Sequence, residues 1–102
     1  MKPAVLGDEA FAELEEAIEF IEARRKGYGA LLHAAIEAEI CRIQKHPEWF
    51  ARLESSEYRR LVMRKFSYNI YFRELDTYVW IAAISHQSRD QTYWMVRNPP
   101  EA

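Results

Sequence analysis

The chain has 102 residues, of which 49% are hydrophobic and 14% aromatic, and its formal net charge is −2. This length allows one domain, residues 1–102, around one core, and the composition excludes an intrinsically disordered chain. The sequence lacks a run of about 18 apolar residues, so we expect no transmembrane span and no membrane partner. Asp8 and Glu9 follow where a secretory signal would be apolar, and Cys41 is the single cysteine, so we expect a cytoplasmic protein without an internal disulfide.

The charge is distributed unevenly along the chain. Residues 1–57 carry 12 acidic and 7 basic side chains and residues 58–102 carry 4 and 7, so the two parts have net charges of −5 and +3. Such a split is consistent with two faces that meet different partners. An acidic helix beside a basic sheet edge on an ordinary folded domain is the simpler explanation, and composition alone favours it.

The start of the chain predicts a strand and a helix. Residues 2–6 form a short opening strand at a sheet edge, a position that tolerates Pro3. Asp8 is a suitable N-cap for a helix over residues 9–25. Apolar residues recur along this helix at helical spacing and form one stripe, made of Phe11, Leu14, Ile18 and Ile21.

A second helix is predicted over residues 28–44, after a stop at Gly27. Its apolar stripe consists of Tyr28, Leu32, Ile36, Ile40 and Ile43. The two helices make a helical hairpin over about residues 9–45, and their stripes need a common surface to cover. Proline ends the second helix, and residues 46–57 follow as a loop that Trp49, Phe50 and Leu53 attach to the core.

Residues 58–97 are rich in β-branched and aromatic side chains, which favour strands. Polar pairs at Ser67-Tyr68 and Asp76-Thr77 divide them into three strands, so we expect an antiparallel meander over about residues 58–86 and a tail over residues 87–102. Helices grouped ahead of an antiparallel sheet indicate an α+β fold of order β-α-α-β-β-β, with the hairpin on one face of the sheet.

The other face of this sheet is predicted to be open. Side chains alternate between the two faces of a strand, and the last strand is apolar on both sides, as expected of a central strand. We therefore expect arginines of neighbouring strands to converge on the open face, opposite the helices. The predicted face carries Arg60, Arg64, Tyr71 and Arg73, and the tail borders it with His86, Arg89, Tyr93 and Arg97.

A series of motifs runs through this second part of the chain. They are Arg59-Arg60-Leu61-Val62, then Phe66-Ser-Tyr-Asn-Ile-Tyr-Phe72, an apolar strand, His86-Gln-Ser-Arg-Asp90 and Tyr93-Trp94. Their ordered combination resembles the RelE/ParE toxin superfamily, and Ser67 stands where that pattern has a proline. The helical hairpin and the His46-Pro47-Glu48 loop also fit, so the resemblance covers about residues 8–97.

The resemblance implies the toxin of a two-gene toxin–antitoxin system, which a cognate antitoxin holds inactive in a hetero-oligomer. RelE-like members cut messenger RNA on the ribosome, and ParE-like members inhibit DNA gyrase without nuclease chemistry. The antitoxin is expected to be acidic in part and disordered in its C-terminal half, and to become ordered as it wraps the toxin. Arginines of the toxin would then pair with its carboxylates, and apolar anchors would fill the groove along the helical hairpin.

The RelE-like pattern has two basic residues on the second strand, an arginine on the third, an arginine closing the fourth and a tyrosine in the tail. Arg60 matches the first position and Tyr93 the last, whereas Val62, Asn69 and Gln87 occupy the other three. RNA cleavage needs an activator for the 2′-hydroxyl, cations for the phosphorane and an acid for the leaving oxygen. We therefore predict a ParE-like protein and place gyrase inhibition ahead of mRNA cleavage.

Two sets of candidate site residues follow from this resemblance. A ribonuclease would use catalytic groups among Arg60, Arg64, Arg73, His86, Arg89 and Tyr93. Binding of the target or the antitoxin would involve Arg59, Arg60, Arg64, Tyr71, Arg73, Arg89, Tyr93, Trp94 and Arg97. Structural roles are the alternative for several of them: His86 as a hydrogen-bonded strand end, and Tyr93 and Trp94 as a cover for the edge of the core.

We expect neither a metal nor a cofactor. His33, Glu37 and Cys41 recur at helical spacing, but the outer two would lie about 12 Å apart along a straight helix, too far for one ion. The sequence shows no Gly-rich phosphate loop, Cys-x-x-Cys pair or Ser/His/Asp arrangement. A non-toxic module that only binds another protein is a further alternative.

Overall fold

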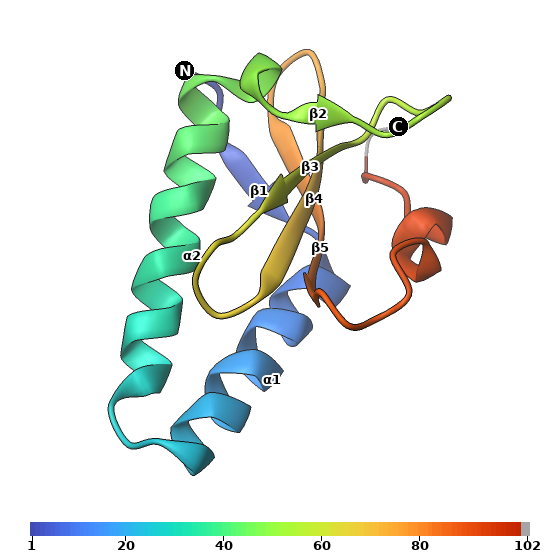
Figure 1. Cartoon of the computed structure of the whole chain (residues 1–102). Coiled ribbons are helices and arrows are strands. Elements are labelled where there is room, and N and C mark those ends of the chain that lie inside the picture. Colours follow the sequence, from blue (N-terminus) through green and yellow to red (C-terminus); the bar gives the residue numbers. More distant parts are fainter. Residues whose placement is uncertain (101–102) are drawn as a thin grey trace.

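A computed structural model describes residues 1–100 of the chain (Figure 1). The elements are β1 (Ala4–Leu6), α1 (Asp8–Arg24), α2 (Tyr28–Lys45), β2 (Ala51–Arg52), β3 (Arg59–Val62), β4 (Tyr68–Glu74) and β5 (Val79–His86). Short 3-10 helices lie at Pro47–Trp49 and Tyr93–Val96. The predicted order is confirmed, and β2 is an addition inside the segment expected to be a loop. Residues 101–102 of the predicted tail lie outside the described residues.

The five strands form one mixed sheet in the order β1-β5-β4-β3-β2. β3, β4 and β5 make the predicted antiparallel meander, β2 adds to β3 antiparallel, and β1 pairs parallel to β5. The register of β4 and β5 shifts at Tyr71/Phe72, which pair with Ala83 and Ile81. Such a bulge adds one residue to one strand and bends it locally, and Ala82 is the extra residue here.

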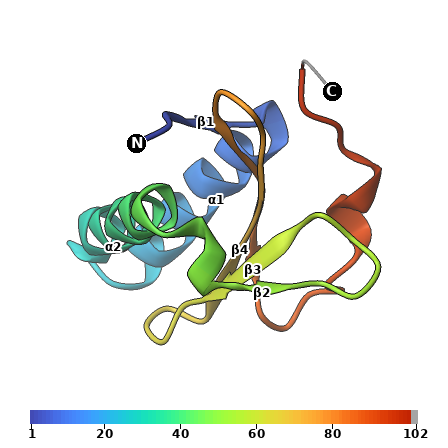
Figure 2. The same ribbon diagram turned by 90° about the horizontal axis from the view of Figure 1, so that it is seen from above.

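The α1–α2 hairpin covers one face of the sheet (Figures 1 and 2). The core between the two layers is apolar and is formed by Ala10, Leu14, Ala17, Leu32, Ile36, Ile40, Ile43, Leu61, Met63, Ile70, Phe72, Val79, Ile81 and Ile84. The stripe predicted for α2 is confirmed, since its four aliphatic residues are all buried. Within residues 1–100, no helix combines the length and the apolar character needed to cross a membrane.

Helix α1 differs from its prediction at the N-cap and along its buried side. Gly7 is the N-cap and Asp8 is the first helical residue. Phe11 is 52% exposed, and the buried residues of α1 are Ala10, Leu14 and Ala17. Alanines on this side let the helix lie close to the sheet, which favours them over the phenylalanine. At Gly7, between β1 and α1, an added Cβ would stand 3.0 Å from the ring of Trp80, which belongs to the cluster on the tail side.

The second face of the sheet is covered by the tail, so the prediction of an open face is wrong. Trp94 of the tail is 0% exposed and belongs to a second buried cluster with Tyr71, Trp80, Ala82 and Ala83. The physical reason is the double-sided apolar character of β4 and β5. Exposed aromatic surface on that face would be costly in water, and the tail removes it from solvent.

The segment between α2 and β3 also differs from its prediction at one residue. Trp49 is 64% exposed and stacks on His46 with ring centroids 3.7 Å apart, so the prediction that it packs on the core is wrong. The 3-10 helix places its ring on the side away from the core. Phe50 and Leu53 do pack against the two buried clusters, Phe50 on the helix side and Leu53 on the tail side.

The turn between β3 and β4 has an unusual backbone. Phe66 and Ser67 both adopt positive φ angles, of 68° and 58°. Proline cannot adopt such an angle, because its ring holds φ near about −65°. A proline could therefore not occupy position 67 with this backbone.

Candidate functional site

Arg60 and Arg73 lie on the same face of the sheet, beside Tyr71. Arg60 is opposite Tyr71 in the β3–β4 register, and Arg73 follows Tyr71 by two residues along β4. Arg60 donates a hydrogen bond to Gln91 of the tail, and Arg73 donates one to Glu57 at 3.0 Å. Two of the predicted arginines thus share a face, although each is held by a different loop.

Arg59 and Arg64 lie elsewhere. Arg59 is opposite Phe72, which belongs to the helix-side core, and it donates a hydrogen bond to the carbonyl oxygen of Phe50 at 2.7 Å. Arg64 is exposed in the turn after β3 and borders a groove beside α2. The predicted convergence of arginines is therefore wrong for Arg64, because β3 ends two residues before it.

Tyr71 and Trp94 are buried against each other. Their exposed fractions are 1% and 0%, and their rings stack with centroids 4.5 Å apart. Stacked aromatic pairs contribute about 0.5–1.5 kcal/mol beyond their buried area. Of the two roles left open for Trp94, the structure shows the cover of the core, and neither ring is accessible while the tail is in place.

Glu13 of α1 and Arg97 of the tail together occupy a free edge of β5. β1 pairs with β5 only as far as Ile81, which leaves the next backbone groups on that edge without a strand partner. Glu13 accepts a hydrogen bond from the Ile84 amide at 3.1 Å, and Arg97 donates one to the Ala82 carbonyl at 2.9 Å. Buried backbone groups must be paired, and here an ion pair replaces a neighbouring strand.

The same carboxylate holds the tail. The Arg97 guanidinium donates hydrogen bonds of 3.0 and 3.1 Å to the two oxygens of Glu13, and the Tyr93 hydroxyl donates a third bond to Glu13. Both side chains of the ion pair are nearly buried, at 11% exposed for Arg97 and 12% for Glu13. Burial, and then the bond to Glu13, raises the pKa of Tyr93 above its ordinary value. Arg97 and Tyr93, predicted to bind a partner, therefore also fasten the tail.

Sequence reasoning missed Glu13, although the sequence contains a signal for it. Ala10 and Ala17 are buried, and Glu13 lies three residues after the first and four before the second. These spacings place it on the same side of the helix. An acidic residue at such a position needs a buried partner, and the tail supplies it.

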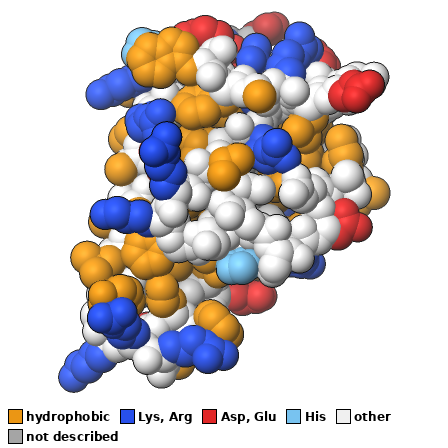
Figure 3. All heavy atoms as spheres, in the orientation of Figure 1, with side chains coloured by type: hydrophobic (Ala, Val, Ile, Leu, Met, Phe, Trp, Pro, Cys, Tyr) orange, Lys and Arg blue, Asp and Glu red, His pale blue; other side chains and the backbone are white. Residues whose placement is uncertain are grey.

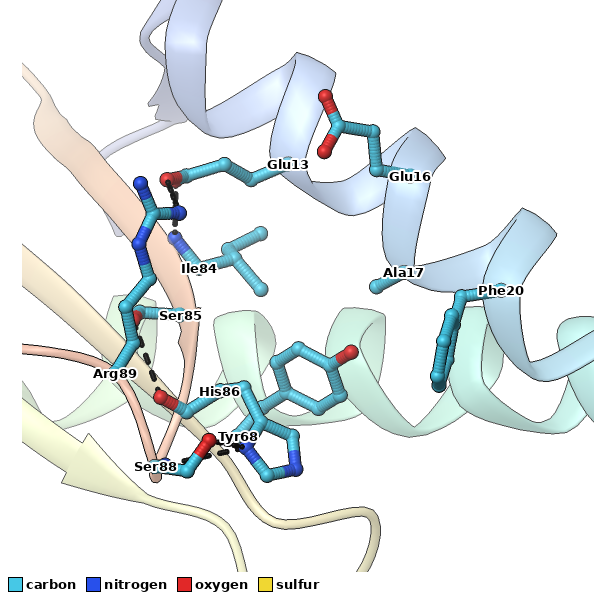
Figure 4. Close-up of a pocket in the computed structure, with 10 residues that line it drawn as sticks. All are labelled: Glu13, Glu16, Ala17, Phe20, Tyr68, Ile84, Ser85, His86, Ser88 and Arg89. Atoms are coloured by element: carbon cyan, nitrogen blue, oxygen red, sulfur yellow. Dashed lines mark hydrogen bonds and ion pairs between the residues drawn. The ribbon is translucent and has the colours of Figure 1, made fainter.

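His86 and Arg89 border a cavity of about 410 Å³ between α1 and the end of β5 (Figure 4). The His86 ring meets Tyr68 edge to face at 5.3 Å, and its Nδ1 lies 2.8 Å from the Ser88 hydroxyl oxygen. Arg89 stacks over Tyr93 at 3.7 Å and lies 3.6 Å from Glu13. Figure 4 shows Phe20 of α1 at the opposite end of this cavity. Its lining includes the carboxylates of Glu13 and Glu16 and the guanidinium of Arg89, so it is a poor site for a phosphate.

Gln87 and Asn69 have structural positions. The Gln87 side-chain amide donates hydrogen bonds to the carbonyl oxygens of Met63 and Tyr68, at 3.0 and 3.3 Å, and so ties the tail to the β3–β4 turn. Asn69 is 3% exposed and donates a bond to the Tyr71 hydroxyl at 3.3 Å. Neither side chain presents a cation or a free acid to a substrate.

A groove runs along the helical hairpin on the side away from the tail. It encloses about 380 Å³ and is lined by Leu6, Phe11, Leu14, His33, Ile40 and Cys41, among others. Its floor is apolar, and the exposed ring of Phe11 lies at its border. Among residues 1–100, no group of three His, Cys, Asp or Glu side chains is placed to hold a metal ion.

No protein-family model matches this sequence, and no curated protein sequence matches it. Solved structures do match. A chain of the chromosomal ParDE TA system from P. aeruginosa has a TM-score of 0.72 at 18% identity, over 84% of this chain and 96% of that chain. This chain has the RelE/ParE-type fold. The E. coli toxin RelE, as a mutant bound to a peptide of the antitoxin RelBc, has a TM-score of 0.61 at 11% identity, over 95% of each chain.

The RelE/ParE-type fold confirms the predicted architecture. Arg60 is bonded to Gln91 of the tail, and Tyr93 of the tail is bonded to Glu13 of α1. Val62, Asn69 and Gln87 carry aliphatic or uncharged amide side chains. Arg60 and Arg73 thus present guanidinium groups on the tail side of the sheet, whereas the rings of Tyr71 and Trp94 are buried there.

Proposed function

We propose that this chain is the toxin of a type II toxin–antitoxin system, that it acts in the cytoplasm by ParE-like inhibition of DNA gyrase, and that a cognate antitoxin neutralises it. The similarity in fold to the ParDE chain, at a TM-score of 0.72, carries the toxin part of the proposal. The gyrase part rests on Asn69 and Gln87, which stand where the RelE-like pattern has arginines. Asn69 is buried and Gln87 holds the β3–β4 turn, so neither can stabilise a phosphorane.

The groove along the hairpin supports an antitoxin partner. An amphipathic helix that binds in a groove presents apolar anchors at helical spacing, and the apolar floor with the exposed Phe11 suits such anchors. The expected assembly is a toxin–antitoxin hetero-oligomer. Purification of the chain with its co-expressed genetic neighbour, followed by mass measurement, tests this part.

The deciding experiment is induced expression of the chain alone, with purified chain then added to gyrase. We expect filamentation, a DNA damage response and inhibited supercoiling, with transcripts left intact. Tyr93→Phe is the informative variant, since a non-catalytic inhibitor keeps its activity without that hydroxyl, provided that circular dichroism shows an unchanged fold. Cut transcripts that disappear in Tyr93→Phe would establish the ribonuclease instead, and normal growth with soluble folded chain would refute the toxin.

A further inference from the structure

The outer edge of β3 is only half covered. β2 pairs with Arg59 and Arg60, and the chain before β2 turns away into the 3-10 helix Pro47–Trp49. The Met63 amide bonds to the Tyr68 carbonyl on the β4 side. Backbone groups of successive strand residues alternate in direction, so those of Val62 point to the uncovered edge. An unpaired strand edge is a template for a strand of another chain.

A groove of about 470 Å³ lies between this edge and α2. Its apolar lining includes Ala35 and Ala38 of α2, Phe50, and Leu61, Val62 and Met63 of the β3 edge. The short side chains of the two alanines leave space on the α2 side of the groove, and Val62 on the opposite side is 55% exposed. The groove therefore has room for apolar side chains next to free backbone groups.

The rim of the groove is basic. Arg42, Arg64 and Lys65 border it, and its single acidic neighbour, Glu39, is paired with Arg42 at 2.8 Å. Arg64 and Lys65 have no ion pair within residues 1–100. In Figure 3, Lys and Arg side chains flank hydrophobic ones along the side of the molecule where α2 lies in Figure 1.

We propose that an extended segment of a partner protein, in which apolar and acidic residues alternate, adds as a strand to β3 at Val62 and fills this groove. Its backbone would pair with the free edge, its apolar side chains would enter the groove, and its carboxylates would meet Arg64 and Lys65. The identification of that partner with an antitoxin rests on the proposed function. An apolar floor and unpaired backbone groups suit a peptide, whereas a nucleic acid backbone needs cations alone.

The test is an NMR titration of the ¹⁵N-labelled chain with a ten-residue peptide of alternating Val and Glu. We expect shifts of the amide signals of residues 62–65 and of Ala35 and Ala38. A peptide N-methylated on the amides that face β3 keeps its side chains but loses the strand pairing, so it should cause no shifts there. Absence of shifts with the parent peptide at millimolar concentration, or equal shifts with the N-methylated one, overturns the proposal.

Charge is tested with variants and a competing ligand. Arg64→Glu with Lys65→Glu should weaken peptide binding about tenfold, because two exposed ion pairs contribute about 1 kcal/mol or slightly more together. Arg25→Glu with Lys26→Glu, at the tip of the hairpin, is the matched control and should leave binding unchanged. Equal weakening of peptide binding in the control variant would refute a role for Arg64 and Lys65. Duplex DNA is titrated in parallel, and a peptide site is refuted if DNA shifts the amide signals of residues 62–65 and the peptide does not.

Growth assays separate this proposal from the proposed function. Lys65→Glu alone leaves every candidate target-binding residue in place and should still arrest growth when expressed, since the groove serves neutralisation. If the wild-type chain fails to arrest growth, the proposed toxin function is refuted. The NMR evidence for a peptide-binding groove would still stand. A variant that folds but no longer arrests growth assigns the groove to the target and overturns its assignment to a neutralising partner.

Discussion

At the scale of single residues, Glu13 connects three parts of the molecule. It lies on α1, pairs with the β5 edge through the Ile84 amide, and accepts hydrogen bonds from Tyr93 and Arg97 of the tail. Removing one partner of a nearly buried ion pair leaves the other charge unpaired, which costs far more than losing an exposed pair.

Glu13→Gln should therefore lower the free energy of unfolding by about 2–4 kcal/mol, because Arg97 and the β5 edge lose a charged acceptor. Urea unfolding followed by circular dichroism measures this loss. Glu16→Gln is the matched control: it lies on the same helix, is exposed, and should change the stability by less than about 0.5 kcal/mol. Equal effects of the two substitutions would show that Glu13 does not stabilise the contact between α1, the β5 edge and the tail.

Three tyrosines have raised pKa values, and we therefore expect the folded chain to lose stability at alkaline pH. Burial raises the pKa of Tyr58 and of Tyr68 above the ordinary value of 10.0, and burial with the Glu13 bond raises that of Tyr93. The folded chain thus keeps protons that the unfolded chain releases. This contribution to stability is complete below pH 10.0 and is lost as the pH rises through the folded-state pKa values. Urea unfolding at a series of pH values should show this fall, less steeply in Tyr93→Phe, and an equal slope in that variant would contradict the assignment.

At the scale of elements, the tail is a cover that is anchored at both ends. Gln87 ties its start to the β3–β4 turn, Arg97 ties its end to α1, and Trp94 fills the space between them over Tyr71. The 3-10 helix is too short to be stable alone, so packing of its one buried ring determines its position.

Trp94→Ala should cost about 3–5 kcal/mol, as expected for truncation of a fully buried aromatic side chain. Val96→Ala is the control in the same short helix, since Val96 is 84% exposed and its truncation should be nearly neutral. Thermal unfolding monitored by circular dichroism compares the two variants. A small loss in Trp94→Ala would mean that the tail leaves the sheet readily in solution.

At the scale of the whole molecule, two layers share one sheet. The hairpin packs on one face and the tail on the other (Figure 1). At the edge of β5, Glu13 of the hairpin pairs with Arg97 of the tail. The uneven charge along the chain is partly neutralised by this contact, because the acidic helix α1 faces arginines of the basic second part.

A shared sheet predicts a single cooperative unfolding transition. Trp80 and Trp94 report on the tail side by fluorescence, and far-ultraviolet circular dichroism reports on the helices. The two urea transitions should coincide within error, as they do in two-state domains of this size. A fluorescence transition at lower urea would show that the tail unfolds separately and would contradict one domain over residues 1–102.

Much of the fold could be predicted because its local patterns agree with its tertiary packing. The aliphatic stripe of α2 and the alternation of Ile70 and Phe72 along β4 determine which side each element buries. Errors arose where several candidates shared a pattern. Phe11 fitted the stripe of α1, but the close approach of helix and sheet selected Ala10 and Ala17 in its place.

The candidate site was less predictable, for a physical reason. Alternation along one strand states which side chains share a face, but not whether another segment covers that face. Arg60 and Arg73 do share one, whereas Arg64 left it because a turn begins earlier than the pattern indicates. Local spacing in the sequence thus determined the two helices, β1 and the strands of the meander, their order and the buried side of α2, but not β2 or the full buried side of α1. Only the tertiary structure decided that the tail closes the second face and that Glu13 pairs with Arg97, because contacts between distant segments depend on how the layers pack and not on any local period.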